Sequence, residues 1–106
     1  MTLDEYQQAA KRTAIYPERA RVTYPALLVA SEAGEVAGKV SKVERGDRSL
    51  DEQKAAIVDE MGDVLWALAA LASDLGVSLQ AVAWRNVEKL ADRERRGVLR
   101  GDGDKR

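Results

Sequence analysis

Apolar residues recur every three or four positions along most of the chain, which is the spacing of an amphipathic α-helix. Segments with this spacing cover residues 2–14, 25–45, 49–75 and 78–96. Short connections between amphipathic helices are typical of helix bundles. The pattern therefore predicts an all-α fold in which four helices form a bundle-like subunit.

Residues that favour helix ends stand at the boundaries of these segments. Thr2 with Glu5, and Ser49 with Glu52, have the Ser/Thr-x-x-Glu spacing of a capping box. Pro25 suits the first turn of the second helix. The other boundary residues are a serine that can cap a helix start and glycines that can end a helix: Ser78, Gly46, Gly76 and Gly97.

The third predicted helix becomes apolar almost all round after Trp66. A helix of this kind is buried on more than one side. A chain of 106 residues has few other helices to cover it, so we expect a subunit interface there. The fourth predicted helix has a narrower apolar stripe that we expect to face the core, made of Leu79, Ala83, Val87 and Leu90.

Two pairs of acidic residues stand inside the second and third predicted helices. They are Glu32 with Glu35, and Glu60 with Asp63, each pair three residues apart around a glycine. Residues at this spacing are neighbours on a helix surface, about 5–6 Å apart. If the two helices face each other, four carboxylates converge, and a cation is needed to offset their repulsion. The alternative is an ordinary solvated helix surface.

The residue types in the chain restrict which cation this site would take. The sequence contains no His and no Cys. Oxygen ligands alone favour a hard cation, Mg²⁺ or Mn²⁺. The missing cysteines also exclude a disulfide framework and a thiolate nucleophile.

Small residues and cations flank the acidic pairs. The second predicted helix contains two glycines, Gly34 and Gly38, in a stripe of small residues with Ser31 and Ser41. Glycines inside a helix favour the close approach of another backbone or of a ligand. On the fourth helix, Asn86, Lys89 and Arg93 line one edge of the apolar stripe. That edge is a solvated face or, beside a metal site, a clamp for phosphate. Lys39 has a weaker case as a substrate contact, because its spacing from Glu35 is that of an ordinary surface ion pair.

Charge and composition restrict the partners and the location. A formal net charge of −1 gives no electrostatic case for nucleic-acid binding. No apolar run approaches the roughly 18 residues of a membrane span, and the N-terminus lacks the order of a signal peptide. We therefore expect a single domain over residues 1–106, located in the cytoplasm, with no nucleic-acid or membrane partner.

The motifs, taken in order, resemble the MazG-like all-α nucleoside triphosphate pyrophosphohydrolases over nearly the whole chain. The segments that carry the resemblance are Asp4-Glu-Tyr-Gln7, Ala30-Ser-Glu-Ala-Gly-Glu-Val36, Asp59-Glu-Met-Gly-Asp-Val-Leu-Trp66, Asn86-Val-Glu-Lys-Leu90, Arg93 and Gly101-Asp-Gly-Asp-Lys-Arg106. The family signature is Glu-Glu-x-x-Glu followed, after a gap, by Glu-x-x-Asp. Residues 98–106 would form a C-terminal tail of the domain.

The resemblance implies hydrolysis of a nucleoside triphosphate to the monophosphate and pyrophosphate. It implies catalytic carboxylates that hold Mg²⁺, with Mn²⁺ as a substitute: Glu32, Glu35, Glu60 and Asp63. It also implies substrate contacts from Asn86, Lys89, Arg93, Asp102 and Arg106. Family members are usually dimers or dimers of dimers, so a homodimer or homotetramer is expected here.

One position departs from the signature, since Ser31 replaces its first Glu. This departure leaves the number of metal ions and the identity of the general base open. We expect Ser31 to serve close helix packing, as part of the stripe of small residues. Two other functions remain open: a phosphoribosyl-ATP-type pyrophosphohydrolase, and a non-catalytic helical module for oligomerisation or nucleotide binding.

Overall fold

The computed structural model describes residues 1–106 and contains helices only. Its elements are α1 (Leu3–Lys11), the 3₁₀ turn η1 (Glu18–Ala20), α2 (Thr23–Glu44), α3 (Leu50–Asp74) and α4 (Leu79–Arg96). The predicted all-α fold with four helices is confirmed.

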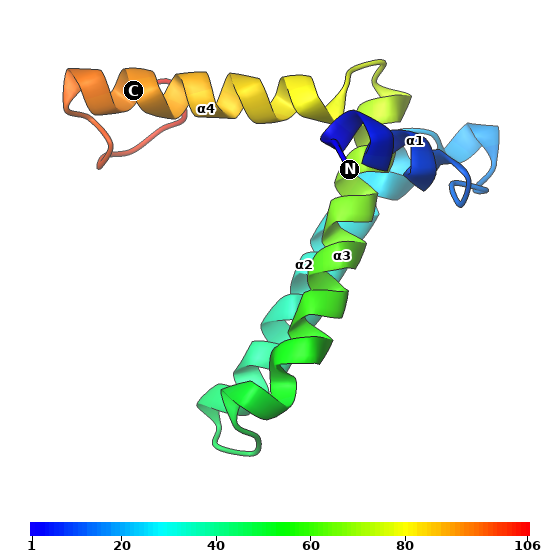
Figure 1. Ribbon diagram of the computed structural model, residues 1–106, viewed down its shortest axis with the longest axis vertical. Coiled ribbons are helices and arrows are strands. Elements are labelled where there is room, and N and C mark those ends of the chain that lie inside the picture. The colour runs from blue at the N-terminus through cyan, green and yellow to red at the C-terminus, as the bar shows by residue number, and fades with distance from the viewer.

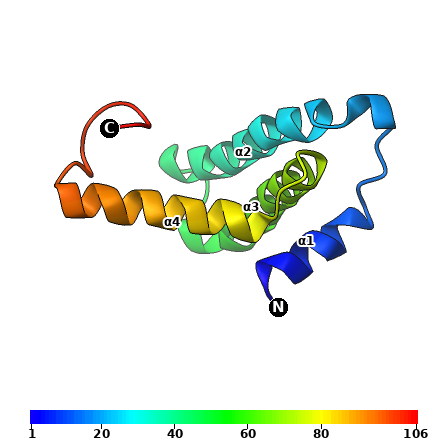
Figure 2. The ribbon, with the colours of Figure 1, turned by 90° about the horizontal axis from the view of Figure 1, so that it is seen from above.

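The four helices form an L with two arms (Figure 1). One arm is the antiparallel hairpin of α2 and α3, and the other is α4, which is bent by 102° from α3. Seen from above, α3 lies between α1 and α2 at the corner of the L (Figure 2). No single helix is long and apolar enough to span a membrane, and α3 with α4 meets that test only as a bent pair.

The predicted capping residues are found at the helix ends. Thr2 with Glu5 and Ser49 with Glu52 each form a complete capping box, and the Ser78 hydroxyl accepts a hydrogen bond from the Ala81 N–H at 3.0 Å. The predicted stop glycines all have positive φ: Gly46, Gly76 and Gly97. The first helix is shorter than predicted, because it ends at Lys11.

A buried glutamine at the corner fixes the start of α4 against α1. The Gln7 amide donates to the Ser73 hydroxyl and to the Val77 carbonyl, both at 3.0 Å. Its oxygen accepts from the Leu79 N–H at 2.7 Å. These hydrogen bonds join α1 to the turn between α3 and α4, so they set the angle between the two arms.

A single carboxylate anchors the connection between α1 and α2 to the end of α3. Asp74 accepts hydrogen bonds from the Tyr16 hydroxyl at 2.7 Å and from the Val22 N–H at 2.8 Å. Val22 has φ of 67° and ψ of −54°, a strained γ-turn conformation that costs a residue with a side chain about 1–3 kcal/mol. The hydrogen bond to Asp74 therefore holds a strained residue directly before α2.

The single chain has a small core. Only ten of its 106 residues are buried, and four of them are alanines of α3. The chain exposes 7766 Å², against about 5,800 Å² for a typical monomer of its mass, 11.6 kDa. One chain alone therefore leaves roughly 1,900 Å² more surface exposed than a compact monomer does.

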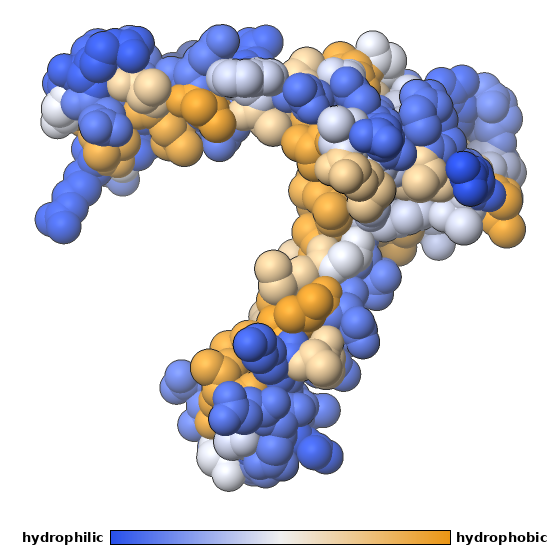
Figure 3. All heavy atoms as spheres, in the orientation of Figure 1, coloured by the Kyte–Doolittle hydropathy of each residue, from blue (hydrophilic) through white to orange (hydrophobic).

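Much of this surface is apolar and lies on the inner side of the L (Figure 3). The prediction that Val87 and Leu90 face the core is wrong within one chain, since they are 55% and 43% exposed. The reason is that α4 packs chiefly at its start, where Leu79 is buried. Helix α3 also keeps large exposed apolar side chains, among them Met61, Leu65 and Leu68.

The stripe of small residues on α2 makes no close packing within the chain. A Cβ added at Gly34 or Gly38 would have no other atom within 4 Å, and Ser31 is exposed. The expectation that Ser31 serves close helix packing is therefore wrong within one chain, because the stripe faces away from α3.

Candidate metal centre between α2 and α3

Three of the four predicted carboxylates converge between the helices of the hairpin. Glu32 comes from α2, and Glu60 and Asp63 come from α3. One carboxylate oxygen from each lies within 4.8 Å of the other two. Glu60 and Asp63 are neighbours because they are three residues apart on one helix, and the antiparallel pairing of α2 with α3 brings Glu32 to them.

The fourth predicted residue, Glu35, is not a member of this three-carboxylate cluster. It is exposed on α2, one turn after Glu32, and its charge still acts on the Glu32 carboxyl group. The structure therefore brings together Glu32, Glu60 and Asp63, with Glu35 at their margin.

The cluster is crowded with negative charge. The pKa of Glu32 is raised, first by its desolvation and then by the charges of Asp63, Glu60 and Glu35. Both effects disfavour the ionised form of Glu32, and the positive charge of a bound cation would favour that form instead. The three oxygens also suit a hard divalent cation, because they are carboxylate ligands only a few ångströms apart.

A lysine and a tyrosine border the cluster. The Lys39 ammonium lies 4.0 Å from a Glu60 carboxylate oxygen, at the outer limit of an ion pair. The pKa of Tyr6 is raised by burial and by the charge of Asp63, which places this α1 residue in the electrostatic field of the cluster. Sequence reasoning assigned Tyr6 no role, although it lies inside the segment Asp4-Glu-Tyr-Gln7 that resembles the family.

An aromatic hollow of about 460 Å³ lies near the cluster. Trp66 and Leu28 line it, each about one helical turn from a cluster carboxylate. The rings of Tyr16 and Tyr24 are 5.3 Å apart at their centroids and form another wall. Trp66 also packs against the small hydrophobic core, so the hollow opens directly beside that core.

The predicted phosphate clamp stands on the other arm of the L. Asn86 and Lys89 line a cavity of about 480 Å³ on α4, together with Arg85 and Lys105. Arg93 lies one turn further along and is only 6% exposed. Within one chain, these cations are therefore on a different element from the three carboxylates.

The two tail residues predicted to contact substrate, Asp102 and Arg106, behave differently from each other. Asp102 is exposed. The Arg106 guanidinium donates to the carbonyls of Val98, Leu99 and Gly103, at distances of 2.7–3.1 Å, so the tail itself engages it. Asp104, to which the sequence reasoning gave no role, pairs with Lys89 at 2.7 Å.

Comparison with known proteins gives one matching family and two related proteins. The family described as the MazG nucleotide pyrophosphohydrolase domain matches residues 23–98, a range that includes the three-carboxylate cluster. No solved structure matches the chain significantly.

The two relatives differ in how much of their length is shared. Gene 37 protein of Mycobacterium phage L5 is 40% identical over 114 aligned positions, which cover 100% of both chains. Uncharacterized protein YvdC of Bacillus subtilis (strain 168) is 42% identical over 69 positions, covering 58% of this chain and 65% of that protein. Neither name states an activity. The match over most of the chain, together with the all-α fold, shows that this protein belongs to the MazG nucleotide pyrophosphohydrolase domain family.

Proposed function

We propose that this protein hydrolyses a nucleoside triphosphate, ribo or deoxy, to the monophosphate and pyrophosphate, with Mg²⁺ as the cation and Mn²⁺ as a substitute. The observation that carries the proposal is the convergence of Glu32, Glu60 and Asp63 within 4.8 Å. Membership of a nucleotide pyrophosphohydrolase family supports the reaction class. We expect the protein to act in the cytoplasm, where nucleoside triphosphates are abundant.

The three carboxylates would hold the cation, with Glu35 available from the next turn of α2. Bound Mg²⁺ would neutralise phosphate charge and polarise the phosphoryl oxygens. One carboxylate of the site accepts a proton from the attacking water. The water oxygen then bonds to the α-phosphorus while the bond from that phosphorus to the bridging oxygen breaks, and pyrophosphate leaves with the bonding electrons.

The cations would act on the phosphate groups. Lys89 and Arg93 stabilise negative charge on the leaving pyrophosphate, and Asn86 donates a hydrogen bond beside them. Lys39 would contact a phosphate that approaches the carboxylates, and its separation of 4.0 Å from Glu60 supports this role. The proposed reaction needs the cations of α4 and the carboxylates of the hairpin near one substrate. Within one chain, however, α4 and the hairpin form separate arms.

We propose a homodimer, or a dimer of such dimers, as the active form. The excess surface of roughly 1,900 Å² per chain supports this, because two copies would bury an area within the range of obligate homodimers. The apolar inner side of the L (Figure 3) is the surface we expect to be covered. Packing there would also bring α4 of one copy near the hairpin of the other.

A substrate panel with a matched pair of variants tests the proposed reaction. Each canonical nucleoside triphosphate and deoxynucleoside triphosphate is incubated with Mg²⁺, and both the nucleotide product and pyrophosphate are measured. Asp63→Asn should lower turnover by at least about a hundredfold, which is the scale of losing a preorganised charge. Asp59→Asn, an exposed acid of α3 outside the cluster, should keep full activity.

The products distinguish this reaction from its alternatives. Monophosphate with pyrophosphate supports α–β cleavage, whereas diphosphate with orthophosphate contradicts it. Turnover of phosphoribosyl-ATP alone would place the protein in the other pyrophosphohydrolase class. Absence of turnover, combined with no effect of Mg²⁺ on the melting temperature, would favour a non-catalytic helical module.

A further inference from the structure

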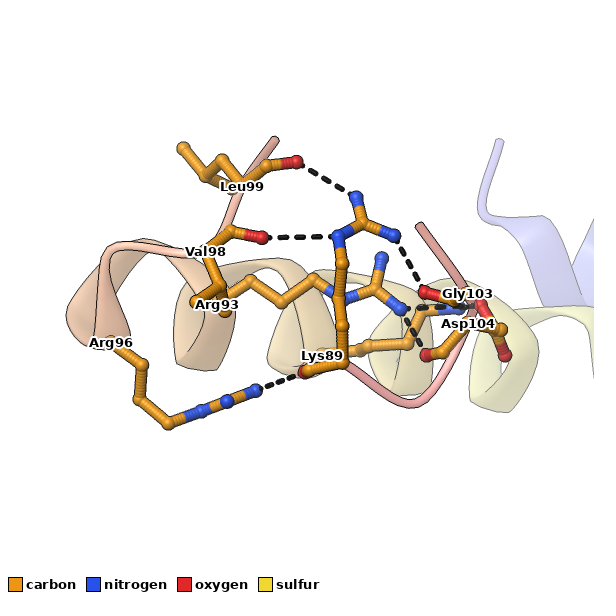
Figure 4. Close-up of polar contacts among 8 residues, drawn as sticks. Lys89, Arg93, Arg96, Val98, Leu99, Gly103 and Asp104 are labelled. Carbon is orange, nitrogen blue, oxygen red and sulfur yellow. Dashed lines mark hydrogen bonds and ion pairs between the residues drawn. The ribbon is translucent and has the colours of Figure 1, made fainter. Parts of the chain in front are cut away.

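The C-terminal tail folds back along α4 and is held there by specific polar contacts (Figure 4). The Asp104 carboxylate lies 2.7 Å from the Lys89 ammonium and 3.3 Å from a terminal nitrogen of Arg93. That same Arg93 nitrogen donates to the Asp104 carbonyl. Arg96 donates to a carbonyl oxygen of Arg106 at 2.6 Å. The tail therefore contacts three cations of α4: Lys89, Arg93 and Arg96.

The path of the tail is specified by its own residues. Gly97, Gly101 and Gly103 all have positive φ, where other residues are strained. A Cβ at Gly101 would lie 3.0 Å from the Arg106 side chain, which closes the loop through hydrogen bonds to three carbonyls. These contacts give the tail a defined path along α4.

Lys89 and Arg93 need a partner of opposite charge to remain together. They are four residues apart on one face of α4, a spacing at which like charges repel. Asp104 contacts both, and it remains 77% exposed at its side chain. Each cation uses only part of its donor capacity on Asp104, because Lys has three N–H donors and Arg has five.

We propose that Asp104 is a positioning residue that draws Lys89 and Arg93 into a single two-cation site for phosphate groups. This inference rests on the proposed function, in which these cations bind the polyphosphate of the substrate. The remaining tail residues hold Asp104 in place: Gly97, Gly101, Gly103 and Arg106. Asp104 touches the cations and not the reacting atoms, so it acts through them.

The sign of one binding change tests the inference, and inorganic pyrophosphate is the probe. Removing the Asp104 charge leaves the site more positive, so a purely electrostatic effect predicts tighter binding of pyrophosphate. Positioning predicts the opposite, since Asp104→Asn lets the two cations separate. We expect calorimetry to give roughly tenfold weaker binding, a loss typical of a misplaced contact.

Asp92→Asn is the matched control. Asp92 also pairs with two cations on α4, Arg95 and Arg96, and forms an ion pair with neither Lys89 nor Arg93. The Asp92→Asn substitution should therefore leave the affinity for pyrophosphate unchanged. In a Lys89→Met background, Asp104→Asn should weaken binding less than it does in the natural chain, because coupled residues are not additive.

Kinetics provide a second readout that a general loss of structure would not reproduce. With a nucleoside triphosphate that the protein hydrolyses, Asp104→Asn should raise KM about tenfold and change kcat by less than about threefold. This is the pattern expected when substrate binding is weakened. Tighter or equal pyrophosphate binding in Asp104→Asn would overturn the inference, as would a natural chain that does not bind pyrophosphate. A chain that binds pyrophosphate with the expected variant effects but hydrolyses nothing would support the inference and contradict the proposed function.

Discussion

At the residue scale, Asp74 shows how a single side chain can fix a connection that carries functional groups. Its carboxylate holds the Tyr16 hydroxyl and the strained Val22 N–H, and Arg21 approaches it to 3.8 Å. These contacts shape the aromatic hollow, because Tyr16 forms part of its wall. The helical period of the sequence contains no information about them, since they join segments that are far apart along the chain.

The Tyr16 hydroxyl provides a prediction in alkaline solution. Burial and its hydrogen bond to Asp74 raise the pKa of Tyr16 from 10.0 to about 12. The unfolded chain therefore loses this proton at a lower pH than the folded chain does. The stability contributed by Tyr16 is fully present below pH 10 and is lost as the pH rises through 12.

Tyr16→Phe isolates this effect. Denaturant unfolding at several pH values between 9 and 12 should show a stability loss in the natural chain that is smaller in the variant. Equal pH dependence in the two proteins would contradict the role of Tyr16. Absorbance of the phenolate gives an independent titration.

Ser31 gives a second prediction at this scale. Ser31 is exposed and the nearby Gly34 has open space, so Ser31→Glu should fold normally. Its new charge would stand four residues from Glu35, a repulsion worth a few tenths of a kcal/mol. We expect the melting temperature to fall by no more than about 4 °C. A larger fall would indicate that the stripe of small residues is packed against a second copy.

At the element scale, the helices and their caps could be predicted closely, and the way they pack could not. Capping boxes and stop glycines are local, so Thr2, Ser49 and Gly97 could be identified from short motifs. The packing of α4 depends on the Gln7 hydrogen bonds at the corner, which no periodicity reveals. Facing acidic pairs could be predicted from spacing, but the separation of Glu35 from the other three depends on the register between α2 and α3.

The hairpin of α2 and α3 carries a prediction about repulsion in the cluster. The pKa of Glu32 is raised by burial and neighbouring carboxylates, so its ionised form is destabilising when no cation is bound. Glu32→Gln should therefore raise the melting temperature at pH 7.5 in the absence of divalent cations. The difference in melting temperature between Glu32→Gln and the natural chain should shrink as the pH falls through the raised pKa of Glu32, because Glu32 itself then takes up a proton.

Adding Mg²⁺ should give the natural chain a higher melting temperature than Glu32→Gln. The cation stabilises the natural chain by binding its folded state, and the neutral amide introduced by Glu32→Gln weakens that binding. Thermal melts with and without Mg²⁺ measure both effects. Glu44→Gln, an exposed acid at the end of α2, serves as the control and should resemble the natural chain in both conditions.

At the scale of the whole molecule, the L shape explains why so many apolar side chains are exposed. The expectation that α3 would be covered on more than one side agrees with its apolar composition, but α1 and α2 cover only part of it. The stripe on α4 was predicted as core, and Val87 and Leu90 lack a partner within one chain. Sequence patterns identify which side chains need burial without specifying whether the same chain buries them.

Assembly can be broken from the α4 arm. Val87→Asp places a charge on the exposed apolar stripe, and we expect it to convert the proposed homodimer to monomers in light-scattering measurements. Buried unpaired charge is costly by several kcal/mol, which is enough to dissociate a dimer. Ile15→Asp changes an apolar residue that is 89% exposed in the connection after α1, and it should leave the assembly intact.

The positions of the two tryptophans give the molecule separate optical reporters. Trp66 stands one turn from Asp63 and donates a hydrogen bond from its indole to the Thr13 hydroxyl at 2.7 Å, while Trp84 is exposed on α4. Fluorescence of the Trp84→Phe protein would then follow events at the carboxylates, and that of the Trp66→Phe protein would follow events on the other arm. Cation binding and subunit association could thus be timed separately, each with its own single-tryptophan variant and without attaching a dye.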